Sequence, residues 1–382
     1  MHILNVNSSL DLKLGGGTAE RTFQMSRFLA KQSGVQCTVL TLDIDSSVSR
    51  ALALLPACKV DLPCLWRRFY LPRAGWRTIN RLVADADIIH LMGHWSVLNL
   101  LVYWAARRAG KPYVLCPAGA LPIFGRSVIL KRLYNFLAGH AIIKNAAGWI
   151  AVTASELPHF EQHGVDAKKV QVIPNGVNED EFPAVELGNL LAKHNVPEAP
   201  IILFMGRLNP IKGPDLLLQA FIQVRDQLTG FHLVFAGPDG GLLEQLRRMT
   251  EHAGISQRVH FLGYLKGVDK SAAYRAARLL VVPSRQEAMS IVAIEAGICG
   301  TPVMLTDQCG FGQIRDIDPR LEVQATVDGI GLGLTQLLGN ADVLIQIAPR
   351  WMYFVKHNFT WDAIGPAYLD LYKSIEVGLS KP

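Results

Sequence analysis

Short apolar runs alternate with amphipathic stretches along all 382 residues of the chain. Six runs in the first half predict strands: HILNVN (2–7), CTVLTL (37–42), ADIIHLM (86–92), PYVLCP (112–117), GWIAVT (148–153) and VQVIP (170–174). Five runs in the second half do the same: IILFMG (201–206), HLVFAG (232–237), RVHFLG (258–263), LLVVPS (279–284) and PVMLTD (302–307). Amphipathic helices are predicted between these strands, including AERTFQMSRFLAKQ (19–32), DLLLQAFIQVRDQL (215–228) and GLLEQLRRMTEHAG (241–254).

The predicted strands are almost continuously apolar, which is typical of parallel sheets covered by helices on both faces. The chain is also too long for one typical domain core. The alternation of predicted strands and helices is interrupted at residues 173–200, where proline and glycine accumulate. We therefore predict an α/β fold of two doubly wound, Rossmann-like domains that break near this segment. Such domains bind ligands outside the carboxyl ends of their strands, so two of them facing each other would form a ligand cleft.

Composition excludes several classes of protein. Half of the residues are apolar and 18% are charged, which excludes an intrinsically disordered chain. The longest apolar run, SVLNLLVYWAA (96–106), is about half as long as a membrane-spanning helix requires. The start, MHILNVNSSL, has no basic segment before its apolar residues, so we expect a strand there and a cytoplasmic chain. The six cysteines form no Cys-x-x-Cys pair, which favours reduced thiols over disulfides or a zinc site.

The basic charge belongs to the first half of the chain. Residues 1–175 have a formal charge of +10 and residues 176–382 one of −4, against +6 for the whole chain. Residues 62–84 contain no acid, and their basic and aromatic side chains are interleaved: Arg67, Arg68, Arg73, Arg77, Arg81, Trp66, Phe69, Tyr70 and Trp76. This composition suits an anionic membrane surface or a phosphate-bearing substrate. It equally suits a solvated helix face, because Arg73, Arg77 and Arg81 are four residues apart.

Two loops are candidates for anion binding. Gly15, Gly16 and Gly17 follow the first predicted strand and precede a helix that we expect to begin near Thr18. Glycine lets the backbone approach a ligand closely, although an ordinary flexible turn has the same composition. Arg207 and Lys212 lie in the loop between a strand and the helix that begins the second domain, where two cations are well placed to bind a diphosphate. No Walker A motif is present.

Glu287 and Glu295 flank an apolar run in RQEAMSIVAIEAGICGTP (285–302). The pattern predicts a loop at Glu287, an N-cap at Ser290, and a helix that contains Glu295 and is closed by Gly300. Eight helical steps would separate the two carboxylates by about 12 Å, whereas glycosidase pairs lie about 5 to 9.5 Å apart. We therefore favour two contacts along one extended ligand over an acid and base couple. Structural carboxylates that bond to loop backbone are the alternative.

Four histidines are considered as chemical groups. DIIHLMGHW (87–95) places His90 and His94 at a strand end, where a general base or an acceptor-binding group would be useful. The alternative is a structural histidine that is simply hydrogen-bonded. His159 and His163 are one helical turn apart, but the His-Glu-x-x-His order and a third ligand are missing. A metal site is therefore not expected.

These motifs together resemble the glycosyltransferases of group 1, also called family 4. The matching segments are GGGTAERTFQMSRFLA (15–30), DIIHLMGHW (87–95), VQVIPNGVN (170–178), GRLNPIKGPDLLLQAF (206–221), FAGPDG (235–240), RVHFLGYL (258–265), PSRQEAMSIVAIEAGICGTPV (283–303) and FTWDAIGPAYLDLY (359–372). Their order and spacing carry the resemblance. It implies the GT-B fold: an acceptor-binding domain at 1–175, a nucleotide-sugar-binding domain at 176–359, and a helix at about 360–378 that crosses back to the first domain.

The resemblance also implies roles for the site residues. Arg207 and Lys212 would bind the diphosphate of a nucleotide-sugar donor, Glu287 its sugar and Glu295 its ribose. Gly16 and Gly17 would lie near the phosphates and the acceptor. Neither a metal nor another cofactor is implied, because the cations and the helix start would stabilise the leaving diphosphate. The implied reaction retains the anomeric configuration, with the departing phosphate helping to take the acceptor's proton.

The chain departs from the family pattern at three positions. Ala118 in CPAGALP (116–122) stands where many relatives have His or Arg, so the role of that side chain is lost or passes to His94. Ser290 stands where relatives often have Gly, and its hydroxyl is a further donor for phosphate. Asn178 stands where they often have Asp.

The sequence leaves three functions open. The leading hypothesis is a retaining transferase in cell-surface polysaccharide synthesis, acting on a saccharide or lipid-linked acceptor, with residues 62–84 contacting an anionic membrane surface. The alternatives are an epimerase of the same fold, which needs no second sugar, and a non-catalytic nucleotide-sugar-binding subunit, which Ala118 suggests. Nucleic acid is not an expected partner, because no recognition motif accompanies the basic charge.

Overall fold

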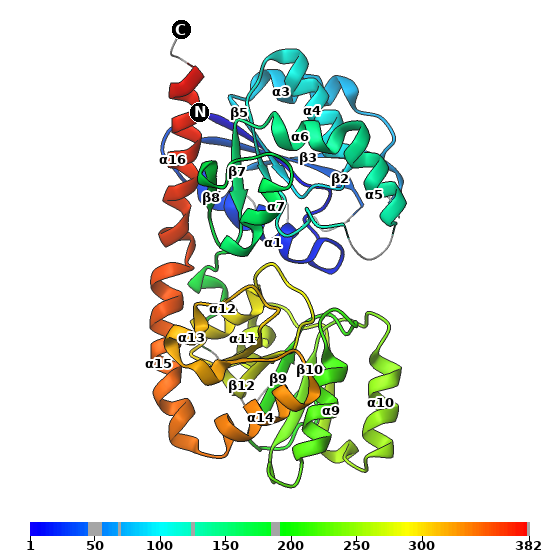
Figure 1. Cartoon of the computed structure of the whole chain (residues 1–382), viewed down its shortest axis with the longest axis vertical. Helices are drawn as coiled ribbons and strands as arrows, with labels where there is room; N and C mark the ends of the chain where they lie inside the picture. The colour runs from blue at the N-terminus through cyan, green and yellow to red at the C-terminus, as the bar shows by residue number, and fades with distance from the viewer. Residues whose placement is uncertain (45–55, 68–69, 124–126, 185–191, 380–382) are drawn as a thin grey trace. The chain divides into compact units, whose positions relative to one another are not determined.

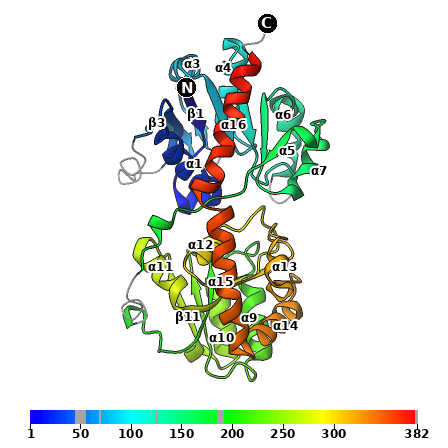
Figure 2. The same ribbon diagram turned by 90° about the vertical axis from the view of Figure 1, so that its left-hand side faces the viewer.

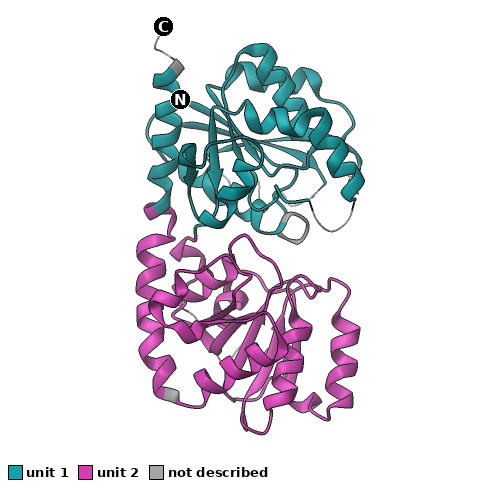
Figure 3. Ribbon diagram, viewed as in Figure 1, with its two compact units in different colours: residues 1–176, 364–382 teal, residues 177–363 magenta. Residues whose placement is uncertain are grey.

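The chain folds into two compact units (Figure 1). The structure is a computed structural model, and it describes residues 1–44, 56–67, 70–123, 127–184 and 192–379. Unit 1 comprises residues 1–176 together with 364–382, and unit 2 comprises residues 177–363 (Figure 3). Each unit contains one sheet, and the prediction of two parallel α/β domains is confirmed.

The sheet of unit 1 has the strand order β4-β3-β2-β1-β5-β6-β7-β8. Every neighbouring pair is parallel except β3 with β4. Its strands are β1 His2–Val6, β2 Gln36–Asp43, β3 Cys58–Trp66, β4 Leu71–Pro72, β5 Ile88–Met92, β6 Tyr113–Cys116, β7 Gly148–Ala151 and β8 Val170–Val172. All six strands predicted for the first half are present.

Helices cover this sheet, and the last of them comes from the end of the chain (Figure 2). The helices are α1 Leu12–Ala30, α3 Trp76–Asp85, α4 Val97–Ala109, α5 Val128–Tyr134, the π-helix η2 Asn135–Gly139, α6 His140–Lys144, α7 Leu157–Glu161 and α16 Trp361–Leu379. Residues of α16 from Ile364 onward belong to unit 1. The hydroxyl of Tyr372 on α16 is hydrogen-bonded to Nδ1 of His90 on β5 at 2.7 Å. The predicted C-terminal helix is therefore confirmed, and it completes the core of unit 1.

Unit 2 has the strand order β11-β10-β9-β12-β13-β14, with all neighbours parallel. Its strands are β9 Ile201–Met205, β10 His232–Ala236, β11 Val259–Gly263, β12 Ala277–Val282, β13 Val303–Thr306 and β14 Glu322–Val323. Its helices are α9 Pro214–Val224, α10 Leu243–His252, α11 Gly267–Ala276, α12 Ile291–Ile298, α13 Ile314–Ile317, α14 Val327–Leu338 and α15 Ala341–Asn358. Counted within the unit, the order is 3-2-1-4-5-6, the doubly wound arrangement that binds ligands where the strand order reverses. That switch point lies between β9 and β12.

Two details of unit 1 differ from the sequence predictions. The glycine turn lies inside α1, which begins at Leu12 and is broken at Gly16 (φ 56°, ψ −138°), instead of preceding a helix that begins near Thr18. Residues 62–84 are not one helix face: they contain the end of β3, then β4, then α3 from Trp76. Arg73 therefore precedes the helix that carries Arg77 and Arg81. Arg68 and Phe69 lie outside the described residues.

All six cysteines are free thiols, as the sequence predicted. Among the described residues, no single helix is long and apolar enough to cross a membrane. One pair of helices, Val327–Leu338 with Asp342–Asn358, reaches that length and composition together, but it is bent by 100°.

A glycine fixes how closely the loops after β9 and β12 approach each other. Gly213, just before α9, has φ 68°, and a Cβ atom there would lie 2.0 Å from the carbonyl oxygen of Pro283, which follows β12. Arg285 reinforces this contact, because its backbone N–H donates to the carbonyl of Ile211 at 2.8 Å. Its guanidinium donates to both carboxylate oxygens of Asp215, at 2.9 and 2.6 Å. The two loops at the switch point are therefore held in direct backbone contact.

We predict that Gly213→Ala destabilises the protein by about 2 kcal/mol or more, because it adds both backbone strain and a backbone clash. Gly254 is the matched control, since it has φ 66° and open space where its Cβ would lie. Gly254→Ala should cost only the strain, about 1 kcal/mol. Urea unfolding of the two variants measures the difference, and equal losses would contradict a close approach at Gly213.

Candidate active site

The candidate residues of unit 2 gather at its switch point. Arg207 and Lys212 lie in the loop between β9 and α9, and Glu287 lies in the loop between β12 and α12. β9 and β12 are parallel neighbours in the sheet, so these loops leave the same edge. The ammonium group of Lys212 forms an ion pair with Oε1 of Glu287. The structure thus joins two residues that the sequence placed 75 positions apart.

The loop that carries Glu287 is fixed from its other side by the segment after β13. The N–H of Glu287 donates to the carbonyl of Gln308 at 2.9 Å. Gly310 has φ 62°, and a Cβ atom there would lie 1.9 Å from the carbonyl oxygen of Ala288. Oε2 of Glu287 is buried and has no hydrogen-bond partner among the described residues. One carboxylate oxygen is therefore held by Lys212, and the other has its bonding capacity unused.

Glu295 is held by different partners. It lies within α12, it is 5% exposed, and both of its oxygens accept hydrogen bonds from α11. Lys270 donates to Oε1 at 2.6 Å and the Tyr274 hydroxyl donates to Oε2 at 2.5 Å. Burial and the adjacent carboxylate raise the pKa of Tyr274, so its hydroxyl stays protonated and keeps donating. Glu287 and Glu295 bind separate lysines and are not a couple that shares one proton.

The start of α12 lies between the two glutamates. Ser290 is its N-cap residue, as predicted, but its side chain makes no capping bond to the helix. The residue is completely buried, and its hydroxyl has no partner within the described part of the chain. The first N–H groups of any helix also lack intrahelical acceptors and carry the positive end of the helix dipole. This position can therefore donate several hydrogen bonds to an anion.

His94 is the corresponding candidate in unit 1. It follows β5, beside the β1 and β5 switch point, and it is 2% exposed. Its Nε2 lies 2.9 Å from the amide oxygen of Asn135 in η2, which favours the tautomer with the proton on Nε2. Burial lowers the pKa of His94 to about 4, although Asn135 opposes the shift. The ring is therefore neutral near pH 7, and its Nδ1 is a buried acceptor with no partner among the described residues.

Ala118 follows β6, and His94 follows the neighbouring strand β5. Met92 pairs with Cys116, so the residues two positions beyond each leave the sheet at neighbouring strand ends. Ala118 has φ 51°, a left-handed conformation that costs a non-glycine residue about 1 kcal/mol. The next residue, Gly119, donates its N–H to the buried carboxylate of Glu156 at 2.7 Å. The loop is therefore held with a strained backbone at Ala118, although the side chain of Ala118 is only a methyl group.

Gly16 and Gly17 complete the unit 1 candidates. They lie in the segment that follows β1, and β1 is the other strand of the switch point. The φ of 56° at Gly16 favours glycine, and a Cβ atom there would meet nothing within 4 Å. The backbone at this break is consequently accessible beside open space.

The structure corrects the prediction for His90 and places His163 beside another histidine. His90 does not lie at the strand end: it is in the middle of β5, fully buried, and bonded to Tyr372. His163 contacts His140, with their Nδ1 atoms 2.9 Å apart. Over the described ranges, no three His, Cys, Asp or Glu side chains are placed to hold a metal ion.

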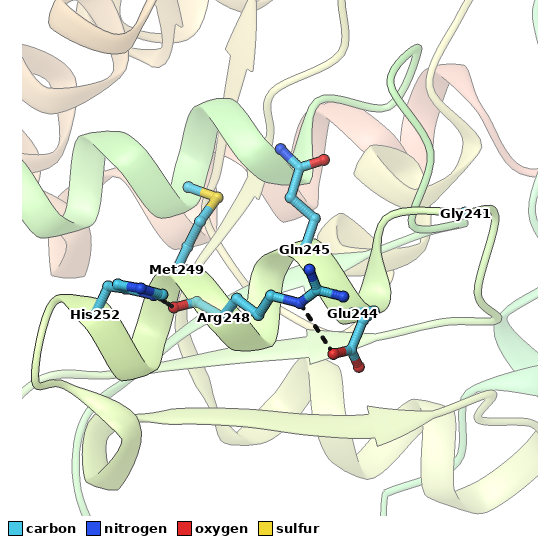
Figure 4. Close-up of a pocket in the computed structure, with 6 residues that line it drawn as sticks. All are labelled: Gly241, Glu244, Gln245, Arg248, Met249 and His252. Carbon is cyan, nitrogen blue, oxygen red and sulfur yellow. Dashed lines mark hydrogen bonds and ion pairs between the residues drawn. The ribbon is translucent and has the colours of Figure 1, made fainter.

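A shallow hollow on α10 contains none of the candidate residues (Figure 4). It is lined by Gly241, Glu244, Gln245, Arg248, Met249 and His252. Arg248 and Glu244 form an ion pair there at 3.1 Å, and both side chains are about two-thirds exposed. An exposed pair of this kind contributes little binding energy. The hollow is therefore not a convincing active site.

Comparison with known proteins identifies the family. Residues 15–181 match the model of Glycosyltransferase Family 4, and residues 189–316 match that of Glycosyl transferases group 1. The chain is 30% identical over 327 residues to the D-inositol 3-phosphate glycosyltransferase of Frankia alni, covering 76% of this chain and 77% of that protein. The chain belongs to the group 1 glycosyltransferases.

Further comparisons extend this result. The D-inositol 3-phosphate glycosyltransferase of Salinispora tropica is 29% identical over 329 residues, covering 76% of this chain and 66% of that protein. Anabaena HepE, solved with UDP and glucose, superposes with a TM-score of 0.79 at 17% identity, covering 98% of this chain and all of that chain. Sucrose-phosphate synthase from Thermosynechococcus elongatus superposes with a TM-score of 0.77 at 20% identity, covering 99% of both chains. The fold of this glycosyltransferase is GT-B.

Sequence reasoning missed the residues that hold the candidate groups in place. Lys270 and Tyr274 were not singled out, although their spacing of four on one helix was a usable signal. Asn135 and Glu156 carried no local signal, because each acts on a residue 37 or more positions away. Partners so distant in the sequence can be identified only from the folded structure of the glycosyltransferase.

We predict that His94 makes the protein less stable in acid. Its folded pKa of about 4 lies below the value of about 6.5 for an unfolded chain, so the unfolded state binds more protons between these values and stability falls as pH falls through this window. The expected loss from pH 7 to 4.5 is about 2 kcal/mol. His94→Gln should remove this loss of stability, as measured by urea unfolding at both pH values. An unchanged pH dependence of the unfolding free energy would contradict a buried, neutral His94 ring.

Proposed function

We propose that this glycosyltransferase moves a sugar from a nucleotide-sugar donor to a saccharide or lipid-linked acceptor, with retention at the anomeric carbon and without a metal. A role in cell-surface polysaccharide synthesis is part of the proposal. The observation that carries it is the switch point of unit 2, where the loop with Arg207 and Lys212 and the loop with Glu287 leave the same edge of the sheet and Ser290 begins α12. Cations, an unused carboxylate oxygen and a helix start together match the parts of a sugar diphosphate.

The diphosphate would bind to Arg207, Lys212 and the first turn of α12. Two cations and free N–H groups stabilise the negative charge that develops on a leaving diphosphate. The hydroxyl of Ser290 adds a donor at the same place, and its lack of a partner within the described part of the chain supports this role. These groups supply the electrostatic stabilisation that a divalent cation would otherwise provide.

Donor binding would exchange the partners of Lys212 and Glu287. In the structure these two side chains neutralise each other. A diphosphate competes for the ammonium group, because it offers more charge and more acceptor oxygens. Glu287 is then released to accept hydrogen bonds from sugar hydroxyls, and its buried Oε2 already lacks a partner among the described residues. The pair would thus keep both groups compensated until the donor arrives.

Glu295 would bind the ribose of the donor. An ionised carboxylate accepts about four hydrogen bonds, and Lys270 and Tyr274 occupy one position on each oxygen. The remaining positions can accept the two ribose hydroxyls. Lys270 and Tyr274 would therefore act as positioning residues, which fix the rotamer of Glu295 before the donor binds.

His94 would contact a sugar hydroxyl through Nδ1. A pKa of about 4 makes it a poor general base near neutral pH, but a neutral imidazole nitrogen remains a good hydrogen-bond acceptor. The acceptor's proton would instead pass to the departing phosphate. Gly16 and Gly17 would bring backbone N–H groups close to the phosphates and the acceptor. In this assignment, His94 makes the contact with the sugar that the methyl side chain of Ala118 cannot make.

The acceptor class follows from charge and from the relatives. Residues 1–175 have a formal charge of +10, which favours an acceptor that carries phosphate. The names of the Frankia and Salinispora relatives add D-inositol 3-phosphate as a compound to test beside lipid-linked saccharides. UDP-glucose is the first donor to test, because HepE has been solved with it.

We predict that Lys212→Ala and Glu295→Ala each weaken donor binding about tenfold or more, because each removes a charged partner of a bound polar group. A thermal-shift screen of UDP, GDP, ADP and their sugars selects the donor, and isothermal calorimetry measures the affinity. Lys193→Ala is the matched control: Lys193 also forms an ion pair in unit 2, with Asp269, but on an exposed surface. Undiminished affinity in Lys212→Ala and Glu295→Ala would refute the assignment.

Product analysis tests the reaction itself. The full chain is incubated with the selected donor and either D-inositol 3-phosphate or a lipid-linked saccharide extract, and NMR gives the anomeric configuration of the new bond. Retention and an intact acceptor adduct are expected. Epimerised donor without an acceptor, or donor binding with no turnover on any acceptor, would overturn the proposal.

A further inference from the structure

One helical segment of unit 1 has an apolar side that the protein core does not cover. The segment consists of α5 and η2, residues 128–139, and we call its outward side the α5–η2 face. Its large exposed apolar residues are Ile129, Leu130, Leu133, Phe136 and Leu137. Ile129 and Phe136 are 82% and 83% exposed, and α5 has no buried residue. Exposed apolar residues are usually scattered, so five on one short segment indicate a contact surface.

The α5–η2 face is held outward by contacts on the opposite side of the segment. Tyr134 donates its hydroxyl to the carbonyl of Ser96 at 3.2 Å, and Asn135 is buried and bonded to His94. Ala138 and Gly139 are also buried. A π-helix inserts an extra residue per turn and occurs mainly at functional positions. Because these residues anchor the segment, its apolar side cannot turn inward to join the core.

The stretch of chain that contains the α5–η2 face has only positive formal charge. Residues 88–155 contain no Asp or Glu, and their basic residues are Arg107, Arg108, Lys111, Arg126, Lys131, Arg132 and Lys144. Arg132 lies on the segment itself and Lys144 at the end of the following helix, and both are exposed. Lys131 lies 5.6 Å from the centre of the Trp95 ring. A second copy of the chain would present the same positive charge, which opposes self-association through this surface.

We propose that the α5–η2 face docks on an anionic lipid bilayer. Phe136, Leu137 and the apolar residues of α5 would enter the boundary between headgroups and acyl chains, while the basic residues contact the headgroups. Apolar insertion combined with a basic surface supplies the two signals that stable membrane association needs. Docking would also bring His94 to the membrane, because Asn135, its partner, immediately precedes Phe136. The inference does not depend on the proposed reaction.

This assignment differs from the membrane surface predicted from the sequence. In residues 62–84, the apolar residues of α3, Ile79, Leu82 and Val83, are buried in the core of unit 1. Arg77 and Arg81 lie on the exposed side of that helix. The exposed apolar residues of this segment, Leu65, Trp66 and Trp76, lie at the end of β3 and at the start of α3, so they do not form one continuous helical face. The α5–η2 face combines charge with uncovered apolar side chains.

The test is co-sedimentation of the full chain with vesicles of phosphatidylglycerol and phosphatidylcholine in equal amounts. The wild type should bind, and it should bind far more weakly to phosphatidylcholine alone. Phe136→Ser/Leu137→Ser should reduce the partition coefficient about tenfold or more, because it removes most of the inserted apolar area. Ile129→Ser/Leu133→Ser is the second variant and should reduce binding in the same direction. Thermal unfolding checks that each variant is folded.

Leu332→Ser/Ile345→Ser is the matched control. These residues are 60% and 58% exposed, and they lie on the bent pair of unit 2 helices. This variant should bind vesicles within about twofold of the wild type. Loss of binding in this variant, with the two variants of the α5–η2 face unaffected, would overturn the proposal.

Three further results would also overturn it. The first is no binding of the wild type to anionic vesicles. The second is loss of binding only in Arg73→Glu/Arg77→Glu/Arg81→Glu, which would assign the contact to residues 62–84. The third is a wild-type dimer in sedimentation velocity that becomes monomeric in Phe136→Ser/Leu137→Ser, which would make the face an interface between copies of this chain.

Discussion

The parallel pairing of β9 with β12 is the constraint on which the candidate donor site depends. The chain leaves β9 for one neighbour and leaves β12 for the other, so the loops after these two strands meet without a strand between them. Backbone contact at Gly213 then fixes their separation, and Gly310 in the segment after β13 holds the β12 loop from its other side, since neither position has room for a Cβ atom. The strand order therefore brings Lys212, Glu287 and the start of α12 together, without long side-chain extensions.

The buried polar groups divide into two classes that have different functions. Glu156 and Glu295 each have both oxygens bonded, so they brace loops and helices at little electrostatic cost. Glu287, Ser290 and His94 each have a buried atom that lacks a partner among the described residues. Leaving such an atom unbonded costs about 1 to 3 kcal/mol, and a folded protein tolerates that cost mainly where a ligand compensates it. The second class therefore includes these three residues of the family motifs, together with core residues such as Asn99 and Ser284.

The sequence predicted the sheets well because continuous apolar runs have few alternatives to buried parallel strands. It missed β3, the strand next to the edge strand β4, whose residues are mostly outside the core and so show no apolar run. It selected Arg207, Lys212 and Glu287 by their positions beside predicted strand ends, and Glu295 by its position in the helix that follows. It could not find Lys270 or Asn135, because their importance comes from a partner brought close only by folding. It assigned the proposed membrane contact to the basic and aromatic residues of 62–84, since exposure of apolar residues such as Phe136 cannot be read from a sequence.

The C-terminal helix has a consequence for how the protein is made. Unit 2 is one continuous segment, whereas unit 1 takes its last helix from residues after 363. Phe28 lies so close to Gly365 that a Cβ there would be 2.2 Å from its ring, and His90 is bonded to Tyr372. Because synthesis runs from the N-terminus, the sheet of unit 1 is made before unit 2 but lacks this cover until residues after 363 are added. Unit 1 is therefore begun before unit 2 and completed after it, and its sheet stays without this cover for the whole time in which unit 2 is synthesised.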